Sequence, residues 1–150
     1  MKKLFTALLL SFVFITSYAQ DNDYKMELAK QDLAKYSNGI LNGYEAVSFN
    51  SLGFAFINKQ NVKFQGDSVI VWEALYSLIE DEFKYNLMIY QREYNCRENI
   101  LRIVYQGPSY KNQKMINSGL GAVYMAAKPI IPNSTGESMF KYACSLRNNY

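Results

Sequence analysis

Short β-strand patterns follow one another from Gly53 to Met125, and residues that favour turns separate them. The β-branched run Val69-Ile70-Val71, just before Trp72, is the most clearly strand-like of these patterns. Turn-forming residues recur at spacings of about 8–12 residues, which is typical of antiparallel sheets. The pattern therefore predicts an antiparallel sheet of about six strands.

The expected strands are short. Residues 58–61 are expected to turn the chain between two of them, and Gly107-Pro108 to end another. Residues 40–50 are expected to form a connector that holds at most a short strand. The expected strands cover residues 54–57, 62–64, 68–72, 87–96, 100–106 and 119–125.

A helix is expected after Pro132-Asn133. Ser134 stands three residues before Glu137, so its hydroxyl can cap the helix while the Glu137 carboxylate reaches back to the N–H of Ser134. One face of this helix is apolar and is expected to lie on the sheet. The residues of that face are Met139, Phe140, Ala143 and Cys144.

A second helix is expected at residues 21–37, ahead of the sheet. Asp21 to Asp23 can supply its N-cap, and Asn38-Gly39 can end it. Its apolar residues recur at helical spacing: Met26, Ala29, Leu33 and Tyr36. The sequence thus predicts an α+β fold with an N-terminal helix and a C-terminal helix.

The first 19 residues have the three parts of a secretory signal peptide. Lys2 and Lys3 precede the apolar run Leu4–Ile15, and Ser17 and Ala19 are small residues suited to cleavage. The run is shorter than the roughly 20 apolar residues that a membrane-spanning helix needs. The alternative, a core helix, lacks an amphipathic period. The protein is therefore expected to be exported, to the periplasm, the outer-membrane surface or the medium.

Cleavage after Ala19 leaves 131 of the 150 residues, enough for one domain. It removes two of the 16 basic residues, so 14 remain against 13 acidic ones and the net charge is +1. No stretch is basic enough to indicate nucleic-acid binding. The expected divisions are a signal peptide at 1–19, a helix and connector at 20–50, and an α+β domain at 51–150.

Four segments resemble, in order, motifs of the surface-adhesin protein E-like family of small exported bacterial domains. They are Phe56–Val62, the strand Val69–Trp72, the Tyr-x-Cys segment and following strand Glu93–Arg102, and Ile131–Ser134 with a helix that reaches Cys144. The resemblance covers about two-thirds of the chain. It implies an antiparallel sheet backed by a helix, and an adhesive function of the kind known for the founding member.

The resemblance also implies one disulfide, between Cys96 and Cys144. The residues favour the same bond, because an exported domain with two cysteines, one on a strand and one on the inward face of a helix, is expected to join them. The helix and the sheet are therefore expected to be covalently linked.

The composition argues against catalysis. The chain has no histidine, which removes Ser-His-Asp and Cys-His nucleophiles and the commonest zinc sites. The carboxylates at 80–82 have the spacing of an acid–base pair or cation site, but a solvated turn explains them better. A strand bend explains Gly119-Leu120-Gly121 better than a dinucleotide loop does, and a helix cap explains Asn133-Ser134-Thr135 without a glycan. We expect no catalytic residue, no metal site and no cofactor.

The aromatic residues are ambiguous. Tyr90 and Tyr94 share a strand face with Arg92 and Cys96, so they are expected to pack in the core, as is Trp72. No ligand-binding residue is identified by the sequence.

Three functions remain open. The first is a non-catalytic binding module that recognises a protein or an extracellular polymer. The second is a structural or accessory subunit of a bacterial envelope complex, docked through the helix at 21–37. The third is an enzyme without histidine. A homodimer is compatible with the first two.

Overall fold

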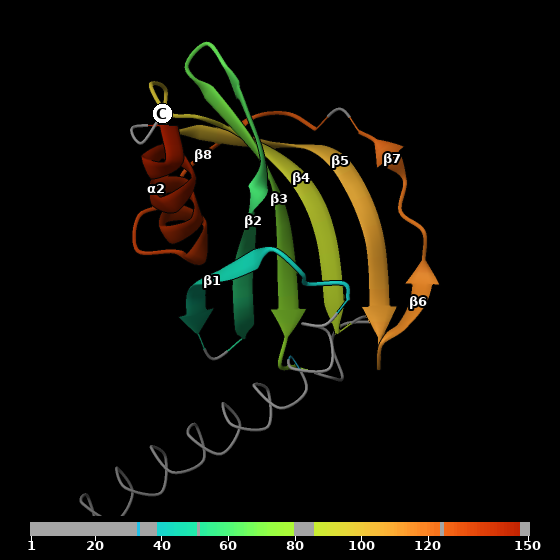
Figure 1. Cartoon of the computed structure of the whole chain (residues 1–150). Helices are drawn as coiled ribbons and strands as arrows, with labels where there is room; N and C mark the ends of the chain where they lie inside the picture. The colour runs from blue at the N-terminus through green and yellow to red at the C-terminus, as the bar shows by residue number, and fades with distance from the viewer. Residues whose placement is uncertain (1–32, 34–38, 51, 80–85, 124, 148–150) are drawn as a thin grey trace, which may run out of the picture. The chain divides into compact units, whose positions relative to one another are not determined.

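The structure is a computed structural model that describes residues 33, 39–50, 52–79, 86–123 and 125–147 (Figure 1). The chain divides into two compact units, residues Met1–Asn38 and Gly39–Tyr150. The expected signal peptide lies outside the described residues, and so does the expected N-terminal helix apart from Leu33. The fold described below is that of the second unit.

An antiparallel meander forms most of this unit. Its strands are β1 (Tyr44–Asn50), β2 (Gly53–Gln65), β3 (Ser68–Ser77), β4 (Leu87–Asn95), β5 (Ile100–Lys111), β6 (Lys114–Asn117), β7 (Gly121–Ala122) and β8 (Lys128–Pro129), and its helix is α2 (Thr135–Arg147). Strands β1 to β6 pair in sequence order, while β7 and β8 each pair with β5. The predicted antiparallel sheet with a C-terminal helix is confirmed.

Strand β1 lies where a connector was expected. It pairs with β2 from Tyr44 opposite Asn58 to Asn50 opposite Gly53, so the sheet begins before residue 51. The register shifts between Ala46 and Ser48, and the side chain of Val47 packs against the core. This bulge breaks the alternation by which a strand is recognised in a sequence.

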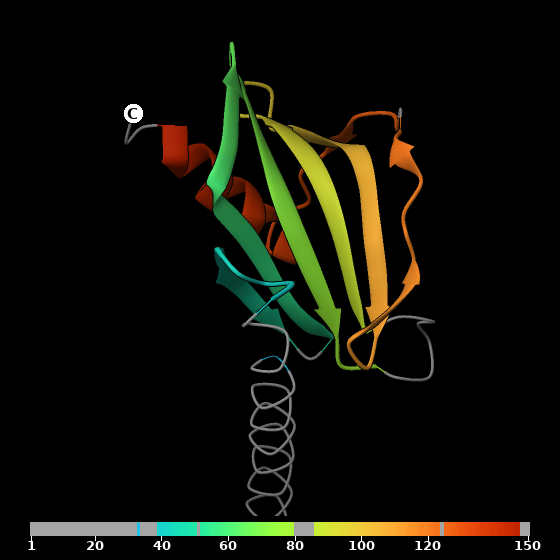
Figure 2. The ribbon, with the colours of Figure 1, turned by 45° about the vertical axis from the view of Figure 1, so that its right-hand side comes forward.

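Strand β2 is one long strand, and the expected turn at 58–61 is wrong. The pairing with β3 is irregular between Asn58 and Lys63, and β2 bends along its length (Figure 2). The buried Asn58 side chain accepts a hydrogen bond from the N–H of Gln60 at 3.0 Å. This bond from the asparagine side chain to the backbone two residues on is typical of turns. Here it stabilises a bulge within the strand instead.

Strand β5 likewise runs through the expected break at Gly107-Pro108. The register with β4 shifts at this point, so the proline, which has no N–H, occupies an irregularity in the ladder. Gly107 is buried, and a Cβ there would lie 3.0 Å from the carbonyl oxygen of Ile89 and 3.3 Å from the Trp72 ring. Close packing against β4 therefore explains this glycine.

Strands β6, β7 and β8 run along the outer side of β5 (Figures 1 and 2). Sequence patterns did not predict β6 or β8, and of the strand expected at 119–125 only Gly121–Ala122 pairs. Asn112 and Gln113 both have positive φ, which makes a two-residue hairpin turn before β6. Glutamine is rare in such turns, so this hairpin has a weak sequence signature.

Helix α2 lies against one face of the sheet and contacts β1 to β4. Ser134 caps it as predicted and accepts from the Glu137 N–H at 3.1 Å. The Glu137 carboxylate, however, accepts from the N–H of Asn133 at 2.7 Å instead of that of Ser134. The capping box is therefore shifted by one residue on the donor side, and Asn133, which supplies the N–H, has a positive φ.

The core lies between α2 and the sheet. Met139 and Ala143 of α2 are fully buried, as the helical spacing predicted. They pack on fully buried sheet residues that include Ile57, Val69, Val71 and Tyr94. Burial of a side chain such as Met139 contributes roughly 1.5–3 kcal/mol.

Candidate functional site

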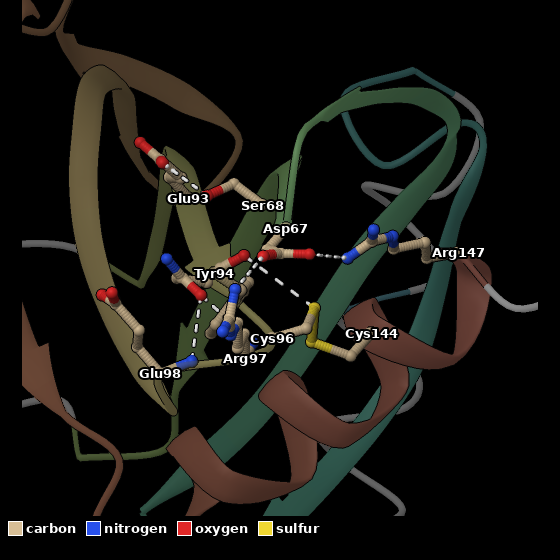
Figure 3. A network of polar contacts seen from close by, with 10 residues as sticks. Asp67, Ser68, Glu93, Tyr94, Cys96, Arg97, Glu98, Cys144 and Arg147 are labelled. Atoms are coloured by element: carbon tan, nitrogen blue, oxygen red, sulfur yellow. Dashed lines mark hydrogen bonds and ion pairs between the residues drawn. A yellow bond between two sulfur atoms is a disulfide. The ribbon is translucent and has the colours of Figure 1, made fainter.

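The predicted disulfide joins Cys96, just after β4, to Cys144 on α2 (Figure 3). The two Cα atoms lie 5.8 Å apart, and 48 positions separate the residues in sequence. Both cysteines are partly buried against the core. The bond thus ties the helix to the end of the central strands.

Asp67, in the turn between β2 and β3, lies beside the disulfide (Figure 3). Its carboxylate is 3.2 Å from Arg147 and 3.8 Å from Arg97, and its backbone oxygen accepts from the Cys96 N–H at 2.9 Å. These ion pairs are largely solvated, so each contributes about 0–1 kcal/mol. The turn is therefore fastened to Cys96 chiefly by the backbone hydrogen bond, and the disulfide joins Cys96 to α2.

A buried ionic network lies on the face of the sheet that α2 covers. The fully buried carboxylate of Glu73 on β3 lies 2.7 Å from the Arg92 guanidinium on β4. The fully buried Tyr94 hydroxyl donates to the other Glu73 oxygen and accepts from Arg92 at 3.4 Å. Arg92 Nε is buried and has no acceptor among the described residues.

The charges of this network stabilise one another. Burial raises the pKa of Glu73, and Arg92 and Tyr94 oppose that effect. Burial acts to lower the pKa of Arg92, but the Glu73 carboxylate and Tyr94 raise it overall. Burial, followed by the charge of Glu73, raises the pKa of Tyr94. The network therefore holds a carboxylate and a guanidinium together inside the domain.

Tyr90, Arg92 and Tyr94 share one face of β4, as predicted. Tyr94 is fully buried in the core, whereas Tyr90 is only half-buried, contrary to expectation. Arg92 lies 6.0 Å from the centroid of the Tyr90 ring, and the Tyr94 ring contacts Phe140 of α2 edge-on at 6.0 Å. Trp72 is only half-buried, contrary to expectation. Its neighbours in β3 are core residues of the helix side, so Trp72 lies on the opposite face, where its ring meets that of Tyr105 at 5.3 Å.

The structure explains two of the three weaker sequence motifs, and the third lies outside the described residues. Gly119 and Gly121 have φ values of 91° and 76°, which fits the predicted bend. The segment 133–135 caps α2, as expected. The carboxylates at 80–82 lie outside the described residues.

A different surface stands out along β5. Five of the eight large apolar side chains that are exposed in the described part of the chain lie between Met115 and Ile131. Four of them run alongside β5, and we call these four the apolar row: Met115, Ile116, Leu120 and Met125. Nothing in the sequence indicated this row, because exposure of a strand depends on which strand ends the sheet.

Two hollows flank the break between β7 and β8. One, of about 220 Å³, is lined by Ile103, Val104, Ala122, Val123 and Met125, together with Arg102. The other, also of about 220 Å³, has polar walls that include Glu93, Glu98 and Arg102. Arg102 is held by Glu93 at 2.6 Å, which leaves the first hollow largely apolar.

Within the described residues, no group of three or more Cys, Asp or Glu side chains is placed to hold a metal ion. Over the same residues, no helix is long and apolar enough to cross a membrane. No family model, curated protein or solved structure matches this chain.

Proposed function

We propose that this protein is a non-catalytic exported binding module that recognises a protein or polymer partner. The observation that carries the proposal is the apolar row beside β5. Met115 is 58 % exposed and Leu120 is 69 % exposed, whereas core residues such as Ile57 and Met139 are fully buried. Exposed apolar side chains gathered along one edge of a sheet are candidates for an interaction surface.

The placement of the ionisable groups supports binding over catalysis. The pKa values of Glu73, Arg92 and Tyr94 are all raised, and these three groups pair with one another in the interior. None of the three lines the hollows beside β5. A reacting substrate needs such groups at an accessible surface, so this network is better suited to a structural role.

Export is part of the proposal. The pattern in residues 1–19 supports it, and a disulfide is compatible with an oxidising compartment. Intact-mass analysis of the protein from the periplasm and the medium tests it. We expect cleavage after Ala19, and a protein found only in the cytoplasm with residues 1–19 retained would contradict export.

The resemblance to surface adhesins favours a partner outside the cell. The alternative is an accessory subunit of an envelope complex, docked through residues 21–37. Crosslinking in living cells, followed by purification and mass spectrometry, distinguishes an envelope protein from an external partner. Deletion of 21–37 then separates the two surfaces: binding that survives the deletion supports the sheet domain, and binding that is lost while the domain stays folded supports the accessory subunit.

Salt provides a further test. The net charge of the mature chain is near zero, so long-range attraction is weak and affinity should fall only modestly with ionic strength. A loss of several orders of magnitude between low and physiological salt would contradict recognition by apolar and hydrogen-bonding contacts.

A further inference from the structure

The outer side of β5 carries a discontinuous edge strand, by which we mean β6, β7 and β8 together. Each of these three strands pairs only with β5 among the described residues. Lys111 and Lys114 flank a two-residue turn and pair with each other, so antiparallel geometry directs the N–H and C=O of Met115 away from β5. The edge therefore offers backbone groups for pairing with another extended chain.

The other edge of the sheet is different. Strand β1 is covered by α2, and its Glu45 carboxylate is paired with Lys59 at 2.6 Å. Among the described residues, β6, β7 and β8 make no contact with α2 as extensive as those of β1 to β4. Its short strands, its lysines and Pro129 limit indiscriminate pairing, as is usual at sheet edges. The apolar row is not one of these protective features, because exposed apolar side chains favour association with another chain.

The segment that forms this edge is basic, although Glu98 lines the polar hollow beside it. From Asn99 to Gly136 the chain has no aspartate or glutamate, and it has four basic residues. Arg102 is paired with Glu93, but Lys111, Lys114 and Lys128 are exposed and have no carboxylate partner among the described residues. Lysines that lie among apolar side chains along a sheet edge complement a strand that presents acidic and apolar residues.

The apolar hollow lies at the break in this edge strand. The chain is still bonded to β5 where the N–H of Val123 donates to the carbonyl of Val104 at 3.1 Å, and the next paired residue that the structure describes is Lys128. Ile103 and Met125 line the opening between these two points. A pocket beside a pairing edge can hold one side chain of an added strand and so supply specificity.

We propose that the discontinuous edge strand binds an extended acidic and apolar segment of a partner protein by strand addition, with one apolar side chain of the segment in the hollow lined by Ile103 and Met125. This inference rests on the proposed function and names the surface and the chemistry of the partner. The unpaired backbone orients the segment, the apolar row contributes contact area, and the three lysines select acidic residues.

A synthetic peptide that alternates valine with glutamate, long enough to span β6 to β8, is the probe. The control peptide has lysine in place of every glutamate. Titration of the isotope-labelled purified protein, followed by amide NMR shifts, should show saturable changes confined to β5 and to residues 111–131. We expect the acidic peptide to bind at least about tenfold more tightly than the basic one.

Paired variants test the side chains. Leu120→Glu should weaken binding of the acidic peptide at least about tenfold, whereas Leu52→Glu, at a leucine 57 % exposed on the β1–β2 turn, should not. Lys114→Glu should weaken it by a similar factor, whereas Lys63→Glu, at an exposed lysine of β2, should not. All four residues are exposed, so circular dichroism should show the native fold in each variant.

Three outcomes overturn the proposal. The first is equal binding of the two peptides, or of neither. The second is a set of shifts outside β5 and 111–131. The third is binding of phosphatidylserine vesicles, but not of the acidic peptide, that Lys114→Glu abolishes, since this would assign the edge to a lipid surface. A partner crosslinked in cells equally well by the wild type and by Leu120→Glu would retain the binding function but place it elsewhere.

Discussion

The guanidinium of Arg92 lies 2.7 Å from the carboxylate of Glu73, which has no exposed surface. The two residues come from adjacent strands, and Tyr94 completes their contacts on the helix side. A buried ion pair of this kind gives little net stability relative to apolar residues, but removal of one partner leaves an uncompensated charge. The domain therefore needs both Glu73 on β3 and Arg92 on β4, because either one alone would be a buried charge without a partner.

Arg92→Met tests this requirement. It should reduce the free energy of unfolding by about 3–5 kcal/mol, because Glu73 stays buried without its cation. Adding Glu73→Gln should recover part of the loss, and urea denaturation measures all the variants. A raised pKa in the folded state favours folding at low pH, so the defect of Arg92→Met should shrink as the pH falls towards 4.5 and grow as it rises. Additive single-variant losses would show that the two residues are uncoupled.

The disulfide should contribute much of the stability of the domain. For residues 48 positions apart, the chain-entropy model gives about 4 kcal/mol. Cys96→Ser should therefore lower the melting temperature markedly, and Cys144→Ser should lower it by a similar amount, since either change removes the same bond. Thiol titration of the denatured, unreduced protein should find no free thiol, and two free thiols would contradict the structure.

The Glu137 carboxylate links helix capping to pH. Lys141 and the Asn133 N–H lower its pKa from 4.5, so its contribution to stability is present above that pH and is lost as the pH falls through the lowered pKa. An NMR titration of the side-chain carboxyl should show a midpoint below 4.5. Amide exchange at Asn133 should accelerate over the same range, and Glu137→Gln should abolish this acceleration. A midpoint above 4.5 would contradict the capping geometry.

Gly119 should not tolerate a side chain. Its φ is 91°, and a Cβ would lie 2.3 Å from the carbonyl oxygen of Gln106 and 2.5 Å from that of Gly107. Gly119→Ala should destabilise the domain by more than about 1 kcal/mol. Gly66→Ala is the control, because Gly66 also has positive φ but has open space around it. Equal losses in the two variants would mean that the backbone conformation alone is responsible.

The elements that sequence patterns predicted depend on local information. The β-branched run of β3 and the Ser134–Glu137 cap of α2 lie within a few residues, and so both were found. The disulfide followed from the placement of Cys96 and Cys144 on those elements. Strand β1 and the continuation of β5 were missed, because bulges at Val47 and Gly107 break the period on which recognition depends.

The ionic network and the apolar row depend on tertiary structure. The sequence did indicate that Glu73 faces inward, because it lies two residues after Val71 and four after Val69, on the same face of the strand. That position does not identify Arg92 as the partner. Nothing in the sequence indicated the apolar row, because Met115 and Leu120 are exposed only through the position of their segment at the end of the sheet.

The order of the elements has a consequence for folding. Strands β2 to β6 each pair with the strand just before them, but the helix that covers Ile57, Val69 and Val71 follows all of the strands. The sheet can therefore form early, while its inner face has no cover until Met139 and Ala143 emerge. We expect a chain that ends at residue 134 to bind a hydrophobic dye and to associate with chaperones, and a truncated chain that remains soluble and dye-free would contradict this. Completion of the core should thus wait until α2 has been synthesised.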